Sequence, residues 1–276
     1  MEIDAHQHFW HFHPGRDSWI TEEMSALRRD FLPDELEALL RTQGMGGSVA
    51  VQADQSEDET SFLLQLAESH PFLLGVVGWV DLRAKGLGER LEHFSRFQRL
   101  CGVRHIAQAE ADDFLSRGEV VRGIGLLQDF GLTYDILVYP RQLPAVLSLV
   151  EKLPNQPFVL DHLAKPPIRE GGTEPWAGLM RELAEHSNVW CKVSGMVTEA
   201  SWSGWRPEDF LPYLDVVFEA FGPGRLMFGS DWPVCLLAAG YGEVRELVEK
   251  YARHLSPADR GKLFGGTAAG FYGLGV

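Results

Sequence analysis

Cysteine is scarce in this chain of 276 residues, which contains only Cys101, Cys191 and Cys235. The three lie far apart and form no Cys-x-x-Cys pair, which argues against a disulfide framework and against a zinc knuckle. Each lies in or beside an apolar run, so we expect three buried thiols. This usage fits a reducing compartment, and we expect a cytoplasmic protein.

Positive charge is also in short supply. There are 25 Lys and Arg residues against 39 Asp and Glu, a formal net charge of -14. Such a chain has no general attraction to nucleic acid or to an anionic membrane surface. No apolar run approaches the roughly 20 residues that span a bilayer, and we expect no secretory signal at the N-terminus. These absences favour a protein that acts on a small molecule, with monomer and oligomer both left open.

Short apolar runs are plentiful, and eight of them have the length of a strand. They cover residues 2–6, 48–53, 73–80, 101–106, 132–138, 157–162, 189–193 and 226–229. Several are almost continuous Val, Ile, Leu and Phe, which is typical of parallel strands that are covered on both faces.

Amphipathic helical patterns alternate with these runs. They cover residues 33–40, 59–69, 87–97, 118–130, 143–153, 176–186, 208–221 and 243–255. Eight strand–helix units predict an α/β fold, a (β/α)8 or TIM barrel, formed as a single domain over residues 1–276. The alternative is an open doubly wound sheet. The first strand is followed by no Gly-x-Gly-x-x-Gly, which counts against it.

Two connections are longer than usual, residues 9–32 after the first strand and 165–176 after the sixth. Strand-to-helix loops of a barrel lie on the active face, so we expect these segments to be lids or walls of a site unless they are packed surface excursions.

Polar residues gather where the predicted strands end. His6 and His8 follow the first run, and alternation along a strand points both to the same side. His162 ends the sixth run and Asp231 the eighth. Because strand ends converge on one face of a barrel, these four side chains form a candidate catalytic set. They could hold one divalent ion such as zinc, or they could act on a carbonyl group and a water without metal.

Five longer motifs make the chain similar to a known family. They are Asp-Ala-His-Gln-His-Phe-Trp at 4–10, Gly-Val-Arg-His-Ile at 102–106, Asp-His-Leu-Ala-Lys-Pro at 161–166, Cys-Lys-Val-Ser-Gly at 191–195 and Phe-Gly-Ser-Asp-Trp-Pro at 228–233. The chain resembles the amidohydrolase superfamily, in the amidohydrolase-related branch that includes sugar lactonases of the L-fuconolactonase and L-rhamnonolactonase kind.

The resemblance implies a distorted barrel of the amidohydrolase type and hydrolysis of a sugar lactone, L-fuconolactone or one like it, to its aldonic acid. It also implies that His6, His8, His162 and Asp231 surround the reacting carbonyl. Two-metal members of the family need a bridging lysine or glutamate on the fourth strand and a histidine ligand on the fifth. This chain departs from them, because its fourth strand offers Arg104-His105 and its fifth Asp135. We therefore expect no strict cofactor requirement and at most one divalent ion, held by those four residues.

A mechanism follows as a hypothesis. Asp231 takes a proton from the attacking water, and the histidines polarise the carbonyl oxygen, directly or through a metal. Asp231 or a nearby histidine then returns the proton to the ring oxygen.

Further strand-end residues are predicted to bind the substrate. Arg104 and Lys192 are cations that would contact substrate oxygens, unless they form internal ion pairs with Asp54, Asp135 or Asp161. The expected substrate-binding set is completed by aromatic and polar side chains at strand ends: Trp79, Trp232, His105 and Asp135.

Two other functions compete with the lactonase. One is a metal-dependent decarboxylase or hydrolase of an aromatic or dicarboxylic acid, which would need a firmly bound ion. A dicarboxylate would also call for several arginines in the pocket, and only Arg104 stands at a strand end. The other is a binding barrel without catalysis, which the presence of all four candidate residues disfavours.

Overall fold

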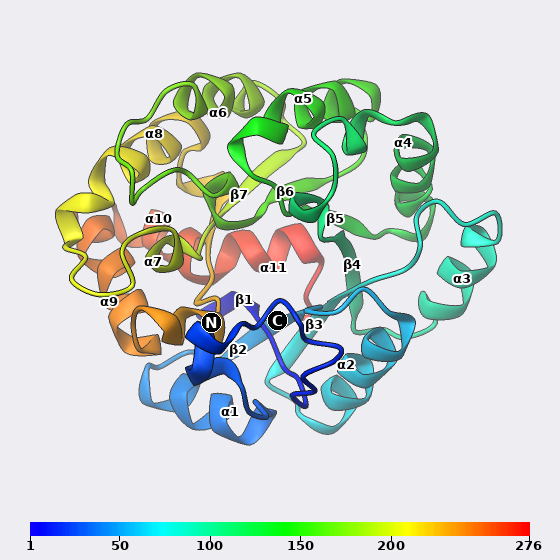
Figure 1. The fold of residues 1–276 in the computed structure, drawn as a ribbon, viewed down its shortest axis with the longest axis horizontal. Helices are drawn as coiled ribbons and strands as arrows, with labels where there is room; N and C mark the ends of the chain where they lie inside the picture. Colours follow the sequence, from blue (N-terminus) through cyan, green and yellow to red (C-terminus); the bar gives the residue numbers. More distant parts are fainter.

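Eight parallel strands form one sheet in chain order in the computed structural model, which describes residues 1–276 (Figure 1). The strands are β1 (Ile3–Gln7), β2 (Gly47–Val51), β3 (Leu73–Gly78), β4 (Leu100–His105), β5 (Thr133–Ile136), β6 (Phe158–Leu160), β7 (Val189–Val193) and β8 (Leu226–Phe228). A bridge between Gln7 and Trp232 joins the last strand to the first, so the barrel is nearly closed. The predicted barrel is confirmed, and the open sheet is wrong.

Helices surround the strands (Figure 1). They are α1 (Pro33–Thr42), α2 (Glu57–Ser69), α3 (Leu87–Phe94), α4 (Gly118–Gly125), α5 (Leu143–Lys152), α6 (Trp176–Ala184), α7 (Met196–Glu199), α8 (Leu211–Phe221), α9 (Tyr241–Tyr251), α10 (Pro257–Gly261) and α11 (Thr267–Tyr272). All eight predicted helical patterns form helices. The short helices α7, α10 and α11 were not predicted, since four to six residues carry little periodic signal.

Several predicted boundaries shift for local reasons. The third strand ends at Gly78 rather than at residue 80, because the side chain of Thr60 accepts a hydrogen bond from the backbone N–H of Trp79 (2.8 Å). Helix α2 begins before residue 59, because Ser56 caps it by accepting from the N–H of Glu59 (3.2 Å). The pattern at 118–130 divides into α4 and a 3-10 turn over Leu127–Phe130.

The C-terminal helix α11 crosses the middle of the barrel in the view of Figure 1. Its residues Ala268 and Tyr272 pack into a small interior cluster that includes Ile3, Val77 and Met227. A second and much larger core fills the space between strands and helices. The barrel therefore has an apolar plug at the end where the strands begin, which leaves its other end for polar side chains.

All three cysteines are free and buried, as predicted. None of the helices combines the length and the apolar character that crossing a bilayer would require.

Candidate active site

An irregularity in β1 turns His6 toward the barrel interior. Ile3 and Ala5 belong to the interior cluster, so strict alternation would point Gln7 inward rather than His6. The pairing with β2 shifts register between Asp4 and Gln7. Because of this shift, Gln7 bonds Ser48 instead, while His6 faces the interior.

The seam between β8 and β1 brings Asp231 to these histidines. The N–H of Asp231 donates to the carbonyl of His6 (2.9 Å), and the N–H of His8 donates to the carbonyl of Trp232 (2.7 Å). A side chain at Gly229 would collide with His6, since an added Cβ would lie 2.6 Å from the His6 Cβ. The Gly229-Ser230-Asp231 segment thus closes the barrel and builds the site with the same residues.

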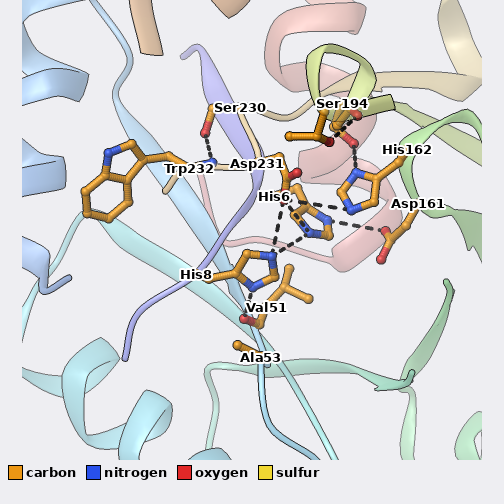
Figure 2. Close-up of polar contacts among 12 residues, drawn as sticks. His6, His8, Val51, Ala53, Asp161, His162, Ser194, Ser230, Asp231 and Trp232 are labelled. Atoms are coloured by element: carbon orange, nitrogen blue, oxygen red, sulfur yellow. Dashed lines mark hydrogen bonds and ion pairs between the residues drawn. The ribbon is translucent and has the colours of Figure 1, made fainter. Parts of the chain in front are cut away.

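Hydrogen bonds fix the protonated nitrogens of His6 and His8. Nδ1 of His8 lies 2.7 Å from the carbonyl oxygen of Val51, which can only accept, so His8 carries its proton there (Figure 2). Nδ1 of His6 faces both a donor, Lys192 Nζ (3.0 Å), and an acceptor, Asp161 Oδ1 (3.3 Å), so its tautomer follows from His8 instead: Nε2 of His8 accepts, and the hydrogen bond between the two rings needs a proton on Nε2 of His6. That proton points at Nε2 of His8, 3.1 Å away.

His162 reaches the same point from a left-handed turn. Residues 162–165 all have φ between 50° and 54°, a conformation that costs about 1–2 kcal/mol per residue for a side chain with Cβ. The indole N–H of Trp176 holds the turn by donating to the carbonyl of Leu163 (2.7 Å). Nδ1 of His162 lies 2.9 Å from the hydroxyl of Ser194. Burial lowers the pKa of His162 to about 4, so the ring is neutral at pH 7.

The carboxylate of Asp231 stands among the three imidazoles (Figure 2). Its Oδ1 lies 3.4 Å from Nε2 of His8 and 3.8 Å from Nε2 of both His6 and His162. Burial alone would raise the pKa of Asp231, but the surrounding histidines outweigh it and hold that pKa below its usual range. Asp231 is therefore a carboxylate at neutral pH.

Below this group lies a buried set of paired charges. Nζ of Lys192 is 2.6 Å from Oδ2 of Asp135 and 2.9 Å from Oδ1 of Asp161. Oδ2 of Asp161 also accepts from Arg104 (2.9 Å). Burial disfavours the charge on Lys192, but the two carboxylates outweigh it and raise the pKa of the ammonium. Burial raises the pKa of Asp135 to about 6, while the hydroxyl of Tyr272 donates to it from α11 (2.7 Å).

The cavity above these groups has a volume of about 320 Å³. Four predicted site residues line it: His8, Arg104, His162 and Asp231. His6 lies beneath them and is fully buried. The long loops each contribute one lining residue, Trp19 from 9–32 and Lys165 from 165–176.

Lys192 and Asp135 were predicted to bind substrate, but the structure places them with no exposed surface and outside the cavity lining. The internal ion pair, left open at the sequence level, is the arrangement found. Its partners are Asp135 and Asp161, while Asp54 lines a different hollow.

The two predicted tryptophans and His105 are likewise outside the lining. The indole N–H of Trp79 donates to Nδ1 of His105 (3.3 Å), and Nε2 of His105 faces Glu110 (3.0 Å). The ring of Trp232 points away from the histidines and packs edge-on against Phe31, with centroids 5.3 Å apart (Figure 2). Trp79, His105 and Trp232 therefore lie behind the residues that line the cavity.

The sequence analysis missed three polar lining residues. Lys165 lies in the motif that carries His162, and its ammonium donates to Glu199, the last residue of α7 (2.8 Å). Gln55 and Gln108 also line the cavity. The motif could have drawn attention to Lys165, whereas the glutamines follow their strands by several residues and carry no distinguishing pattern.

The donor atoms fit one divalent ion. His6, His8 and Asp231 offer atoms that all lie within 4.8 Å of one another, and the nearest pairs are 3.1 and 3.4 Å apart. Ligands around a tetrahedral zinc ion at 2.0–2.1 Å are roughly 3.4 Å apart. Nε2 of His6 cannot carry a proton and bind an ion at the same time. With an ion, the proton would move to Nδ1, which faces Asp161 Oδ1 at 3.3 Å.

Comparison with known proteins adds relatives over nearly the full chain. A family model described as amidohydrolase matches residues 3–274. An L-fucono-1,5-lactonase of Burkholderia multivorans is 46% identical, over 99% of this chain and 96% of that protein. A second L-fucono-1,5-lactonase, from Burkholderia ambifaria, is 39% identical over 99% and 95%.

A crystal structure of an amidohydrolase from Burkholderia multivorans with bound zinc has the same fold. It superposes with a TM-score of 0.96 at 47% identity and covers 99% of both chains. The likeness found in the five sequence motifs is thus confirmed over the whole length. The chain belongs to the amidohydrolase family and is homologous to the L-fucono-1,5-lactonases, which are lactone hydrolases.

Proposed function

We propose that this protein hydrolyses L-fucono-1,5-lactone, or a sugar lactone closely similar to it, to the open hydroxy acid. The observation that carries the proposal is the Asp231 carboxylate, buried among three imidazoles at the floor of a cavity of sugar size. The full-length similarity to two L-fucono-1,5-lactonases supports the choice of substrate.

Asp231 is the general base in this proposal. It accepts a proton from a water as the water oxygen forms a bond to the lactone carbonyl carbon. A carboxylate with a lowered pKa is a weak base, but it is ionised across the neutral range and already faces the cavity. When the ring C–O bond breaks, the protonated Asp231 gives its proton to the departing ring oxygen, which completes the hydroxy acid.

The developing oxyanion needs hydrogen-bond donors. Both ring nitrogens of His8 are engaged within the protein, Nδ1 by the carbonyl of Val51 and Nε2 by His6 and Asp231, so His8 is not assigned to the oxyanion. His162 can donate from Nε2 when the hydroxyl of Ser194 donates to its Nδ1. The guanidinium of Arg104 also lines the cavity, held by Asp161 and Gln52. We assign carbonyl polarisation to His162 and Arg104.

A divalent ion such as zinc, when bound by His6, His8 and Asp231 with His162 beside them, would supply Lewis-acid polarisation of the same carbonyl. The protein's own groups orient the ring and move the proton in either case. Without an ion, His6 does not touch the substrate. It lies beneath the cavity and positions the site through its contacts with Lys192 and Asp161.

The charge of the cavity favours a neutral substrate. Its two lining cations are already paired, Arg104 with Asp161 and Lys165 with Glu199. A dicarboxylate would find no cation in the lining whose charge is not already balanced by a carboxylate. A neutral lactone needs no unpaired cation in the cavity.

The test is hydrolysis of freshly prepared lactones, followed as acid release with a pH indicator, with and without chelator. The panel contains L-fucono-, L-rhamnono-, L-galactono- and D-arabinonolactone. We expect fast turnover of the L-fucono lactone. Activity that persists in chelator assigns polarisation to His162 and Arg104, and loss in chelator with recovery on added zinc assigns it to the ion. No turnover of any lactone would contradict the proposal.

A further inference from the structure

The cavity has an apolar side across from Asp231 and His8. Ile106, Ala109 and Leu137 line it together, and we call these three residues the far wall. They follow β4 and β5, whose last paired residues are His105 and Ile136, so Ile106 and Leu137 come next on neighbouring strands. The backbone N–H of Gln108 donates to the carbonyl of Leu137 (2.9 Å), which joins the two connections.

The strand order places the far wall across the barrel from Asp231. Asp231 and His8 belong to the seam between β8 and β1, and β4 and β5 lie four strands away in a ring of eight. A substrate whose carbonyl carbon meets Asp231 therefore turns the far half of its ring toward the far wall.

A polar atom stands beside the far wall without a partner. The Oε1 of Gln108 is buried and accepts no hydrogen bond within the protein, although Gln108 lines the cavity. A buried amide oxygen left unpaired is costly, and a ligand hydroxyl would satisfy it. The far side of the cavity thus combines an apolar surface with an adjacent hydrogen-bond acceptor.

A 6-deoxy sugar lactone carries that same pair of features. In a 1,5-lactone, C5 bears the methyl group and C4 bears a hydroxyl, and both lie in the half of the ring away from the C1 carbonyl. Resting on the proposed lactonase function, we propose that the far wall binds the C5 methyl group and that Gln108 accepts a hydrogen bond from the C4 hydroxyl. Ile106 and Leu137 are then the residues that select a 6-deoxy lactone.

Three 1,5-lactones with the same ring stereochemistry isolate the methyl group. L-fuconolactone has a methyl on C5, L-galactonolactone a hydroxymethyl, and D-arabinonolactone a hydrogen. An apolar pocket distinguishes one such carbon by about 10- to 200-fold in kcat/KM. We expect the native protein to favour the L-fucono over the D-arabinono lactone by at least about tenfold.

The test compares this preference between variants. In Leu137→Gln the ratio of kcat/KM for L-fucono over D-arabinono lactone is expected to fall to within about threefold of unity, because the methyl then meets an amide. The ratio for L-galactono over L-fucono lactone is expected to rise, because the amide can bond the added hydroxyl. Ile106→Thr provides a second variant, with a smaller fall in the first ratio.

Val234→Thr is the matched control, since Val234 lines the cavity three residues after Asp231 rather than at the far wall. Val234→Thr should keep the native ratio of kcat/KM for L-fucono over D-arabinono lactone. Native-like ratios in both far-wall variants, or a native protein without preference for the methyl group, would overturn this proposal while leaving the lactonase intact. Absence of turnover for all three lactones would instead overturn the proposed function, and this proposal with it.

Discussion

The Nε2 atoms of His6 and His8 lie 3.1 Å apart, and the hydrogen bond between them has only one direction. The carbonyl of Val51 can only accept from Nδ1 of His8, which leaves Nε2 of His8 as the acceptor in the bond from His6. Donation therefore runs from His6 through His8 to Val51, while Nδ1 of His6 lies between the Lys192 ammonium (3.0 Å) and Asp161 Oδ1 (3.3 Å). The carbonyl of Val51 thus sets the tautomers of two rings that an ion would also bind.

This direction predicts the histidine tautomers of the metal-free protein. His6 should carry its proton on Nε2 and His8 on Nδ1, as read from ring nitrogen shifts in two-bond 1H–15N spectra. His70 is an internal reference for the second tautomer, since its Nδ1 lies 2.9 Å from the carbonyl oxygen of Leu66. Added zinc should move the His6 proton to Nδ1. A His6 ring protonated on Nδ1 before any metal is added would refute the hydrogen-bond direction.

Tyr272 should stabilise the fold through Asp135. Its hydroxyl donates to Oδ2 of Asp135 (2.7 Å), while Oδ1 of that carboxylate has no hydrogen-bond partner. Tyr272→Phe removes a donor from a buried carboxylate, so the free energy of unfolding should fall by about 1–3 kcal/mol in denaturant titration. Tyr134→Phe is the matched control, because the hydroxyl of Tyr134 is buried without a partner. Equal losses in the two variants would count against this role.

Gly195 makes room for His162. A Cβ at this position would overlap the His162 imidazole, and its φ of 60° disfavours any side chain. Gly195→Ala should displace the ring and lower kcat/KM by about 100-fold, the effect of a misplacement near 1 Å. Gly204→Ala has a similar left-handed backbone, with φ of 82°, but open space around its Cβ. It should cost about 1–2 kcal/mol of stability and leave lactone hydrolysis unchanged. Matching activity in the two variants would mean that Gly195 matters only for the backbone.

Glu59 should make stability depend on pH. Its carboxyl accepts from the N–H groups of Ala53 and Asp54, and burial raises its pKa to about 8 from an ordinary 4.5. The folded state thus binds this proton more tightly than the unfolded state, so the contribution is complete below pH 4.5 and is lost as the pH rises through 8. Unfolding free energies at pH 5 and pH 8 should differ less in Glu59→Gln than in the native protein. An identical pH dependence would show that Glu59 titrates normally.

The barrel and the outline of the site were within reach of the sequence. Continuous apolar runs indicated buried parallel strands, and polar residues at the run ends indicated the active face. His6, His8, His162 and Asp231 do come together. For His6 the reasoning was incomplete, because it faces inward only through the register shift in β1.

For the remaining site residues, the sequence did not show in which direction each side chain points. Lys192 follows the same strand-end rule as Arg104, yet one is sealed beneath the cavity and the other lines it. Tyr272 arrives from a six-residue helix far along the chain, which no local pattern links to Asp135. The left-handed turn that carries His162 and Lys165 contains no glycine, the residue that would have indicated positive φ from the sequence.

The most direct test of the account is the kcat/KM of Asp231→Asn for L-fucono-1,5-lactone, measured beside the native protein and Asp54→Asn. Asp54 is a strand-end carboxylate that lies outside the cavity lining, so its variant is the control for loss of a charge. The account predicts that Asp231→Asn folds normally and loses about 10²- to 10⁴-fold in kcat/KM, the range for a general base. A folded Asp231→Asn that hydrolyses the lactone at a near-native rate would contradict it.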